Sequence, residues 1–216
     1  MPEPTRTVFA PALQDAVGAL NLLCLEEFTM AAALESPASP AFIREHRAIW
    51  ISGSGAGRRA VSQVVPVVLI DLALFAEHLS LESQPPKEST GLQRRTTSAD
   101  TFSWHQKDRL LDALSALLWR CSHAPLASAS LAMGLPVVGA QTLRRTEWHS
   151  RATLESVPLP APRWTANLTY WRLIGTGCAT GSAELVSQAS RWSLQLTGGR
   201  DSRKANETEG AQSARP

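Results

Sequence analysis

The chain has 216 residues, of which 44% are hydrophobic and 19% are charged, and its formal net charge is +2. This composition excludes an intrinsically disordered chain and supplies enough apolar residues for one large domain or two small ones. The charge is uneven, because residues 1–105 carry 8 basic and 11 acidic side chains, whereas residues 106–216 carry 13 basic and 8 acidic ones. The basic half permits contact with phosphate backbones without requiring it.

The first half of the chain is predicted to form a leader over residues 1–9 and a helical part over residues 10–82. Within this part, apolar residues recur at the spacing of one helix face over residues 10–35. The stripe consists of Leu13, Val17, Leu20, Cys24, Phe28 and Ala31. The segment SPASP at 36–40 ends this helix, because proline cannot continue the hydrogen-bond ladder. A short helix is expected to follow over residues 41–50.

A second long helix is predicted over residues 58–81, after a glycine-rich turn. Its longest uninterrupted apolar run, residues 64–70, has seven residues. A membrane span needs roughly 20. We therefore expect a buried helix and a soluble protein without membrane contact.

The cysteine pattern favours a cytoplasmic location. The three cysteines, Cys24, Cys121 and Cys178, are far apart, odd in number and without CxxC spacing, and the N-terminal residues lack a basic n-region. These features argue against secretion. Cys24 and Cys121 lie inside apolar helical patterns, which is typical of buried free thiols.

The second half is expected to begin with a polar linker over residues 83–101, followed by a helical C-terminal part over residues 102–197. Its first helix, residues 102–121, would present an apolar face of Leu110, Leu111, Leu114, Leu117 and Leu118, with Ser103 as a cap. Residues 164–174 and 192–196 show partial alternation, so helix and a small β-hairpin both remain open. The polar residues 198–216 predict a disordered tail. The predicted class is mainly α.

Residues 126–145, LASASLAMGLPVVGAQTLRR, fit the spacing of a helix-turn-helix unit. Gly134 would be the turn residue, since glycine takes a positive φ without penalty. The positions that such a unit buries are then Ala129, Met133, Leu135, Ala140 and Leu143. Ser130 supplies a small residue where the two helices cross. A helix-turn-helix can place its second helix in the DNA major groove.

Polar residues of the second helix, residues 137–148, would then point outward. Glutamine can read adenine, and arginine can bond guanine or phosphate. The candidate DNA-binding residues are Gln141, Thr142, Arg144 and Arg145, with Arg120 and Arg151 on flanking phosphates. The start of this helix is less typical, because base-reading residues usually stand where this chain has Pro136, Val137 and Val138. The alternative is a plain helical hairpin inside an all-α core.

Residues 122–145, SHAPLASASLAMGLPVVGAQTLRR, also carry a family resemblance. Together with the leucine-rich helix before them, they resemble the C-terminal part of small regulatory proteins encoded on bacterial integrative conjugative elements. They are loosely similar to the flagellar master-regulator subunit of the FlhD type as well. The resemblance rests on Ala129, Leu131, Gly134, Leu135 and Leu143. It implies a bacterial, cytoplasmic accessory protein in transcription regulation, linked to DNA and to a mobile element.

Other motifs predict no catalysis. The segment GSGAGRR at 53–59 lacks the ending of a Walker loop and the spacing of a dinucleotide fingerprint, so a flexible linker is favoured over a phosphate site. Cys121 and His123 form the one close pair of ligand types, whereas zinc needs three or four ligands. No local motif marks a nucleophile and its base. We therefore predict no enzyme, no metal and no cofactor.

Seven tryptophans are a further feature, and four of them adjoin an arginine in the sequence. Large aromatic side chains are most often core residues, although such pairs can also stack on bases or line a protein interface. Two functions are consistent with all these features. The first is an accessory protein that binds double-stranded DNA. The alternative is a helical scaffold whose apolar stripe, residues 13–31, and tryptophans form a surface for a protein partner or for self-association.

Overall fold

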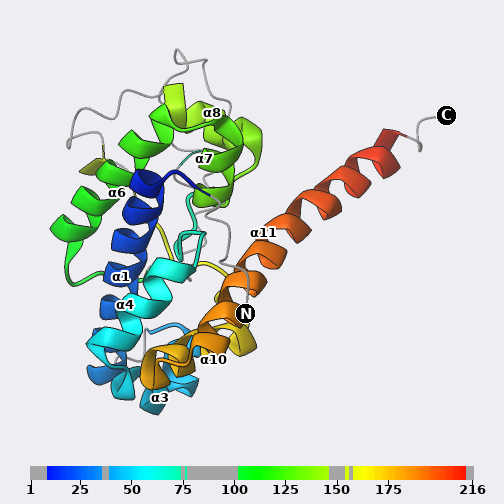
Figure 1. Ribbon diagram of the computed structural model, residues 1–216. Helices are drawn as coiled ribbons and strands as arrows, with labels where there is room; N and C mark the ends of the chain where they lie inside the picture. Colours follow the sequence, from blue (N-terminus) through cyan, green and yellow to red (C-terminus); the bar gives the residue numbers. More distant parts are fainter. Residues whose placement is uncertain are drawn as a thin grey trace, which may run out of the picture.

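The computed structural model describes residues 9–35, 39–73, 76, 102–145, 154–155 and 158–212, with the backbone alone described for Arg145 and residues 198–212. In these residues one isolated β-bridge, between Ile70 and Pro162, accompanies nine helices, so the mainly α class is confirmed (Figure 1). The helices are α1 (Pro11–Ala33), α2 (Ala41–Glu45), α3 (Arg47–Ser52), α4 (Gly55–Val64), α6 (Lys107–His123), α7 (Leu126–Met133), α8 (Val137–Arg145), α10 (Leu168–Thr180) and α11 (Ala183–Gln212).

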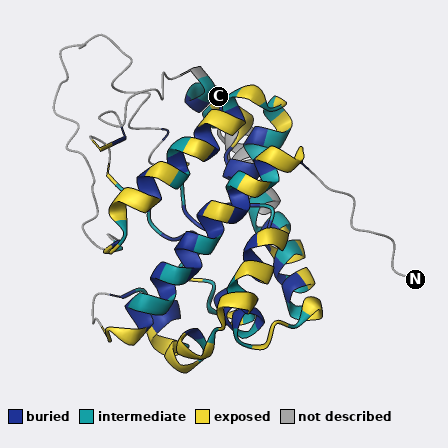
Figure 2. Ribbon diagram, turned by 60° about the vertical axis from the view of Figure 1, so that its left-hand side comes forward, coloured by how far each residue is buried: buried dark blue, intermediate teal, exposed yellow. Residues whose placement is uncertain are grey.

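α1 is the central helix, and both ends of the molecule are built on it (Figure 1). Toward one end it packs against α6, which in turn carries α7 and α8. Toward the other end it packs against α2, α3 and α4, which also contact α10. The predicted stripe from Leu13 to Ala31 is buried throughout. Figure 2 shows that the helices have a buried face toward the core and an exposed face toward the outside.

The two predicted helical parts, residues 10–82 and 102–197, share one hydrophobic core, because α1 from the first part packs directly on α6 from the second. The five leucines predicted for the face of α6 are all buried. The linker expected over residues 83–101 and the leader expected over residues 1–9 lie outside the described residues, except for Phe9.

The helix predicted over residues 58–81 is wrong over residues 65–72, and residues 77–81 lie outside the described residues. α4 ends at Val64, directly before Val65 and Pro66. Residues 65–72 then run through the core without helical structure. Residues 67–70 have none of their surface exposed. Proline breaks the helical ladder, and the apolar run that follows is buried on every side, as its composition requires.

The side chain of Asn21 on α1 forms hydrogen bonds with backbone groups of this buried segment, which has no helical bonds of its own. Its Nδ2 donates to the carbonyl oxygens of Val65 at 3.2 Å and Val67 at 3.1 Å, and its Oδ1 accepts from the N–H of Leu69 at 2.9 Å. A buried backbone group without a partner is costly. This buried amide therefore helps to fix the path of the chain between α4 and the α6–α8 end, together with backbone hydrogen bonds from Val68 to Ala132 and from Arg163 to Leu69.

Aromatic rings fill the core at the opposite end. Phe28 lies at the centre of five rings, with centroid distances of 5.3 to 6.3 Å, and these rings belong to Phe42, Trp50, Phe102, Trp104 and Trp171. The core interpretation is therefore confirmed for three tryptophans. Trp119 and Trp192 differ, with 48% and 36% of their surface exposed.

The segments for which a β-hairpin was an alternative are helical. Residues 168–174 belong to α10 and residues 192–196 to α11. Asn167 caps α10, since its Oδ1 accepts from the N–H of Tyr170 at 3.0 Å. Gly175 and Gly177 are not strand-ending turns, because their positions face side chains of α3 and α4 at close range.

α11 begins after Ser182, whose Oγ accepts from the N–H of Leu185 at 3.5 Å. Its backbone is helical to Gln212, whereas the composition of residues 198–216 predicts a disordered tail. Figure 1 shows the far half of α11 leaving the body of the molecule. Among the described residues, α1 is long and apolar enough to cross a membrane, with 67% of its most apolar window buried inside the protein. The buried core helix of a soluble protein passes the same test.

Candidate nucleic-acid interface

α7 and α8 meet at a tight turn with the geometry of a helix-turn-helix. Three residues separate the helices, and the two helix directions differ by 103°. Gly134 has φ 58° and ψ 37°, the left-handed conformation that favours glycine. Its N–H donates to the carbonyl of Leu131 at 3.0 Å, and the N–H of Leu135 donates to that of Ser130 at 3.0 Å. These two bonds form a Schellman motif, which satisfies the end of α7.

The burial predicted for this unit is confirmed at every position. Exposed fractions are 5% or less at Ala129, Met133, Leu135, Ala140 and Leu143. The three small residues Ala129, Ala132 and Ala140 are each 0% exposed. Ser130, predicted to lie at the crossing, also donates its Oγ hydrogen to the carbonyl of Leu135 at 2.6 Å. The pattern of small and apolar residues therefore encodes a real turn between packed helices.

A buried arginine holds the turn from outside the unit. Arg163 is 1% exposed, and its guanidinium donates to the carbonyls of Met133 at 2.7 Å, Gly134 at 2.9 Å and Ile70 at 3.1 Å. A Cβ on Gly134 would clash with the Nη1 atom of Arg163. Glycine is thus required twice here, for its backbone conformation and for the space that the guanidinium fills.

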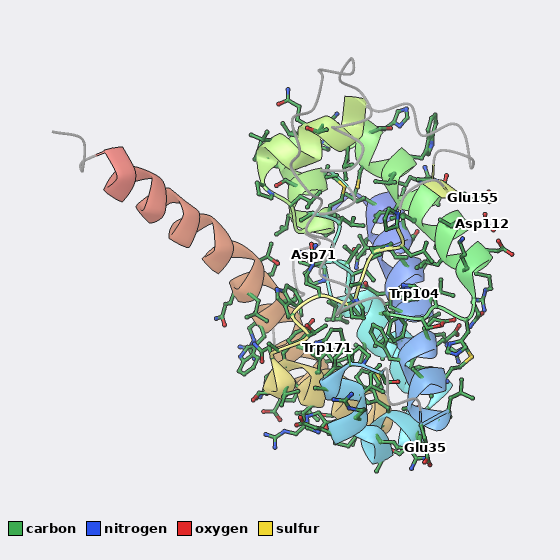
Figure 3. The ribbon with its side chains drawn as sticks, turned by 180° about the vertical axis from the view of Figure 1, so that it is seen from behind. Glu35, Asp71, Trp104, Asp112, Glu155 and Trp171 are labelled. Atoms are coloured by element: carbon green, nitrogen blue, oxygen red, sulfur yellow. The ribbon has the colours of Figure 1, made fainter. Side chains whose placement is uncertain are left out.

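Arg163 also connects the turn to α10. Its own carbonyl accepts a hydrogen bond from the indole N–H of Trp171 at 3.1 Å. Figure 3 shows Trp171 well below the α7–α8 end, with Asp71 between them. The buried arginine therefore lies on a continuous path of hydrogen bonds from one end of the molecule to the other.

α6 completes a three-helix unit with α7 and α8, and α1 supplies its cap. Glu27 on α1 is buried, and its carboxylate accepts from the N–H groups of His105 at 2.8 Å and Gln106 at 2.9 Å. A carboxylate at a helix N-terminus is stabilised by these donors and by the helix dipole. The predicted cap, Ser103, makes no such bond in the structure, and the long-range acceptor takes its place.

The structure places the candidate DNA-binding residues as follows. Gln141 is exposed on α8, and Arg120 is exposed on α6. Thr142 is half-buried, and its Oγ1 donates to the carbonyl of Val138 at 3.1 Å. Arg144 is half-buried and donates to the carbonyl of Ser122 at 3.0 Å, so it also ties α8 to α6. The side chain of Arg145 and the whole of Arg151 lie outside the described residues.

Exposed apolar residues lie beside these polar ones. Val137 and Val138, at the start of α8, are 51% and 75% exposed. Trp119 on α6 is 48% exposed, with its ring centroid 4.3 Å from that of His123. Sequence reasoning did not single out Trp119 for this surface, although its place one turn before the end of the leucine-rich helix was a usable signal. It also missed Arg163, for which the sequence holds no local signal.

The glycine-rich segment 53–59 is neither a flexible linker nor a free anion loop. Ser54 caps α4, since its Oγ accepts from the N–H of Gly57 at 2.9 Å. A Cβ on Gly57 would clash with the carbonyl oxygen of Cys178, so this glycine lets α4 approach α10 closely. Arg58 donates to the carbonyl of Gly53 at 2.7 Å. The segment is therefore a close contact between helices.

All three cysteines are buried and free. Burial raises the pKa of both Cys121 and Cys178 to about 12, and it raises that of Cys24 further. Thiols that stay protonated are poor nucleophiles and poor metal ligands. Within the part of the chain that the structure describes, no three His, Cys, Asp or Glu side chains form a metal-binding group.

Comparisons with protein-family models, curated proteins and solved structures found no match to this chain. The site therefore rests on its own geometry.

Proposed function

We propose that the protein is a non-enzymatic DNA-binding protein, in which the unit of α6, α7 and α8 docks on double-stranded DNA. The observation that carries the proposal is the turn at Gly134, with its 103° angle and its buried small residues. Helix-turn-helix units join their helices at about 90–120° through a short turn that often contains glycine. The second helix, α8, would lie in the major groove.

The exposed start of α8 suits contact with A·T base pairs. Recognition helices contact base edges with their N-terminal residues. Val137 and Val138 are exposed there, and apolar side chains pack against the methyl group of thymine. Gln141 is exposed one turn further along and can bond adenine through both its amide atoms. We therefore expect a preference for sites that contain A·T pairs.

Phosphate contacts would come from the basic residues beside α8. Arg120 is exposed on α6, and Arg144 is held at the junction of α6 and α8. The second half of the chain also carries the excess of positive charge. Such contacts position a protein on DNA without reading its sequence. A cytoplasmic location is part of this proposal.

The test is a duplex-binding titration by fluorescence anisotropy over a series of salt concentrations, with duplexes that differ in A·T content. The Arg120→Ala variant should weaken binding to all duplexes alike and reduce the salt slope by about 0.9. The Gln141→Ala variant should cost about 1–3 kcal/mol on adenine-containing sites and leave other duplexes unaffected.

Arg59→Ala is the matched control, because Arg59 is an exposed arginine on α4, outside the three-helix unit. It should leave duplex binding unchanged. Arg144 is a poor first target, since its removal also breaks the bond to Ser122. Duplex binding that is absent at low salt, or equal losses from Arg120→Ala and Arg59→Ala, would overturn the proposal.

A second candidate function is a protein interaction through the same face. The surface first expected for it, the stripe of residues 13–31, is wrong, because that stripe is buried in the core. The exposed valines of α8 and Trp119 favour a different apolar patch. Light scattering on the protein alone tests self-association, and a Trp119→Ser variant that abolishes association without affecting duplex binding would assign the patch to a second copy.

A further inference from the structure

A groove of about 520 Å³ runs between α10 and α11, at the opposite end of the molecule from α8. α10 lines it with four residues and α11 with five, all spaced three or four residues apart along their helix, which places them on one helix face. On α10 this face includes Arg172, and on α11 it includes Arg191 and Trp192. Pockets for small molecules commonly have volumes of 300–1,000 Å³. The groove is thus large enough for a small ligand.

The groove has an unbalanced positive charge. Arg172 and Arg191 come from different helices and are both exposed, and neither guanidinium makes a hydrogen bond or ion pair with the described residues. Among the described side chains that line the groove, none is acidic. Paired guanidinium groups are the usual protein ligands for phosphate and carboxylate, because their N–H donors match the geometry of the anion.

An aromatic face lies beside these charges. Trp192 is 36% exposed and lines the same groove as its neighbour Arg191. Gln188 and Gln195 lie about one turn to either side on α11 and supply amide donors and acceptors. An exposed indole is a platform on which a flat ring can stack. The groove therefore combines a site for an anion, a site for a flat ring and polar groups between them.

We propose that this groove binds a nucleotide unit, with its phosphate between Arg172 and Arg191 and its base stacked on Trp192. The unit comes either from a free nucleotide or from a single strand of nucleic acid, and both sources offer the same chemistry. A second copy of this chain is a poor occupant, because a symmetric contact would bring four unpaired arginines together. The proposal goes beyond duplex binding by α8 and does not depend on it.

Isothermal titration calorimetry with four probes tests the proposal: adenosine monophosphate, adenosine, inorganic phosphate and a short single-stranded oligodeoxynucleotide. Adenosine monophosphate should bind more tightly than adenosine or phosphate alone, because only it engages both sites. Binding by the oligonucleotide and not by adenosine monophosphate would identify a single strand as the source.

Variants assign the binding to this groove. Arg172→Ala and Arg191→Ala should each weaken the favoured probe on the order of tenfold, since each removes charged donors to the anion. Trp192→Ala should weaken it by a similar factor, and Trp192→Phe should restore most of the loss, because the phenyl ring still stacks. Arg59→Ala, at an exposed arginine outside both the groove and the three-helix unit, should have no effect.

Four results would overturn the proposal. The first is that neither adenosine monophosphate nor the oligonucleotide binds at millimolar concentration, and the second is that phosphate binds as tightly as adenosine monophosphate. The third is that the groove variants bind like the wild-type protein. The fourth is that an acidic peptide binds the groove in preference to both nucleotide probes. A loss of duplex binding in Arg120→Ala with intact nucleotide binding separates this site from the three-helix unit. Thermal unfolding followed by circular dichroism checks that each variant keeps its fold.

Discussion

The two ends of this molecule are packed by different means. At the α6–α8 end, α7 and α8 meet over buried alanines and one left-handed glycine, so the backbones at their turn lie close together. The α10 end is filled by large rings, with Phe42 stacked on Trp171 at 4.3 Å between centroids. Small-residue packing depends on backbone geometry, whereas ring packing depends on buried area. An added side-chain atom should therefore lower the free energy of unfolding more at the α6–α8 end than at the α10 end.

The ends are also joined. Trp171 donates to the carbonyl of Arg163, and the guanidinium of Arg163 donates to the turn at Gly134. One buried side chain thus connects the aromatic end to the helix-turn-helix geometry. Its loss should be felt at the turn, more than 20 residues away in the sequence.

The largest expected effect comes from Gly134→Ala. The left-handed backbone costs an L-residue about 1–2 kcal/mol, and the new methyl group must displace the guanidinium of Arg163. Displacing a buried charge from its partners adds about 3 kcal/mol. We expect the free energy of unfolding, measured by urea denaturation, to fall by about 4 kcal/mol.

Gly181→Ala is the matched control for this prediction. Gly181 also has a positive φ, 66°, but a Cβ there meets no atom within 4 Å. It should cost only about 1 kcal/mol, from backbone strain alone. Equal losses at the two glycines would show that Arg163 adds nothing at the turn, and the contrast between the ends would lose its main support.

A smaller effect is expected from Arg163→Met, which keeps an unbranched chain of similar length but leaves three buried carbonyls without this donor. We expect a loss of about 3 kcal/mol. The sharper measurement is the double variant with Gly134→Ala. Because the guanidinium is then absent, Gly134→Ala should cost only about 1 kcal/mol more, as Gly181→Ala does. Strict additivity would contradict a direct clash between the two residues.

The sequence predicts the α6–α8 end better than the other end, and the reason is physical. Its turn is made by residues within one short stretch, and the positions of Ala129, Gly134 and Leu143 are all set by local helical spacing. The angle of the turn follows from the same local geometry. The sequence also predicts α1, because its stripe is long and regular.

Features that depend on distant residues could not be predicted in this way. The extended path of residues 65–72 depends on Asn21, and the cap of α6 depends on Glu27, both on α1. α10 carries glycines that fit helices α3 and α4, and out of that context they indicate turns. The groove needs α10 and α11 side by side, and no local pattern fixes that arrangement.

The smallest expected effect compares the two ends through their thiols. Cys121 on α6 and Cys178 on α10 are both buried, and burial raises the pKa of each to about 12. Since burial keeps both thiols protonated in the folded protein, their alkylation rates by iodoacetamide report how often each end opens. We expect Cys121 to react faster, because small residues bury less apolar area than rings. Peptide mass mapping over time measures both rates, and faster reaction at Cys178 would reverse the proposed contrast.

The same thiols predict the pH dependence of stability. Each folded pKa, about 12, lies above the ordinary value of 9.0, so the folded protein retains protons that the unfolded chain loses. Their contribution is complete below pH 9 and decreases as the pH rises from 9 toward 12. Cys121→Ala and Cys178→Ala should each flatten this alkaline decrease, because each variant removes a thiol whose pKa is raised by burial. If only one variant flattens it, the other thiol reaches solvent before global unfolding, and that thiol marks the end of the molecule that opens first.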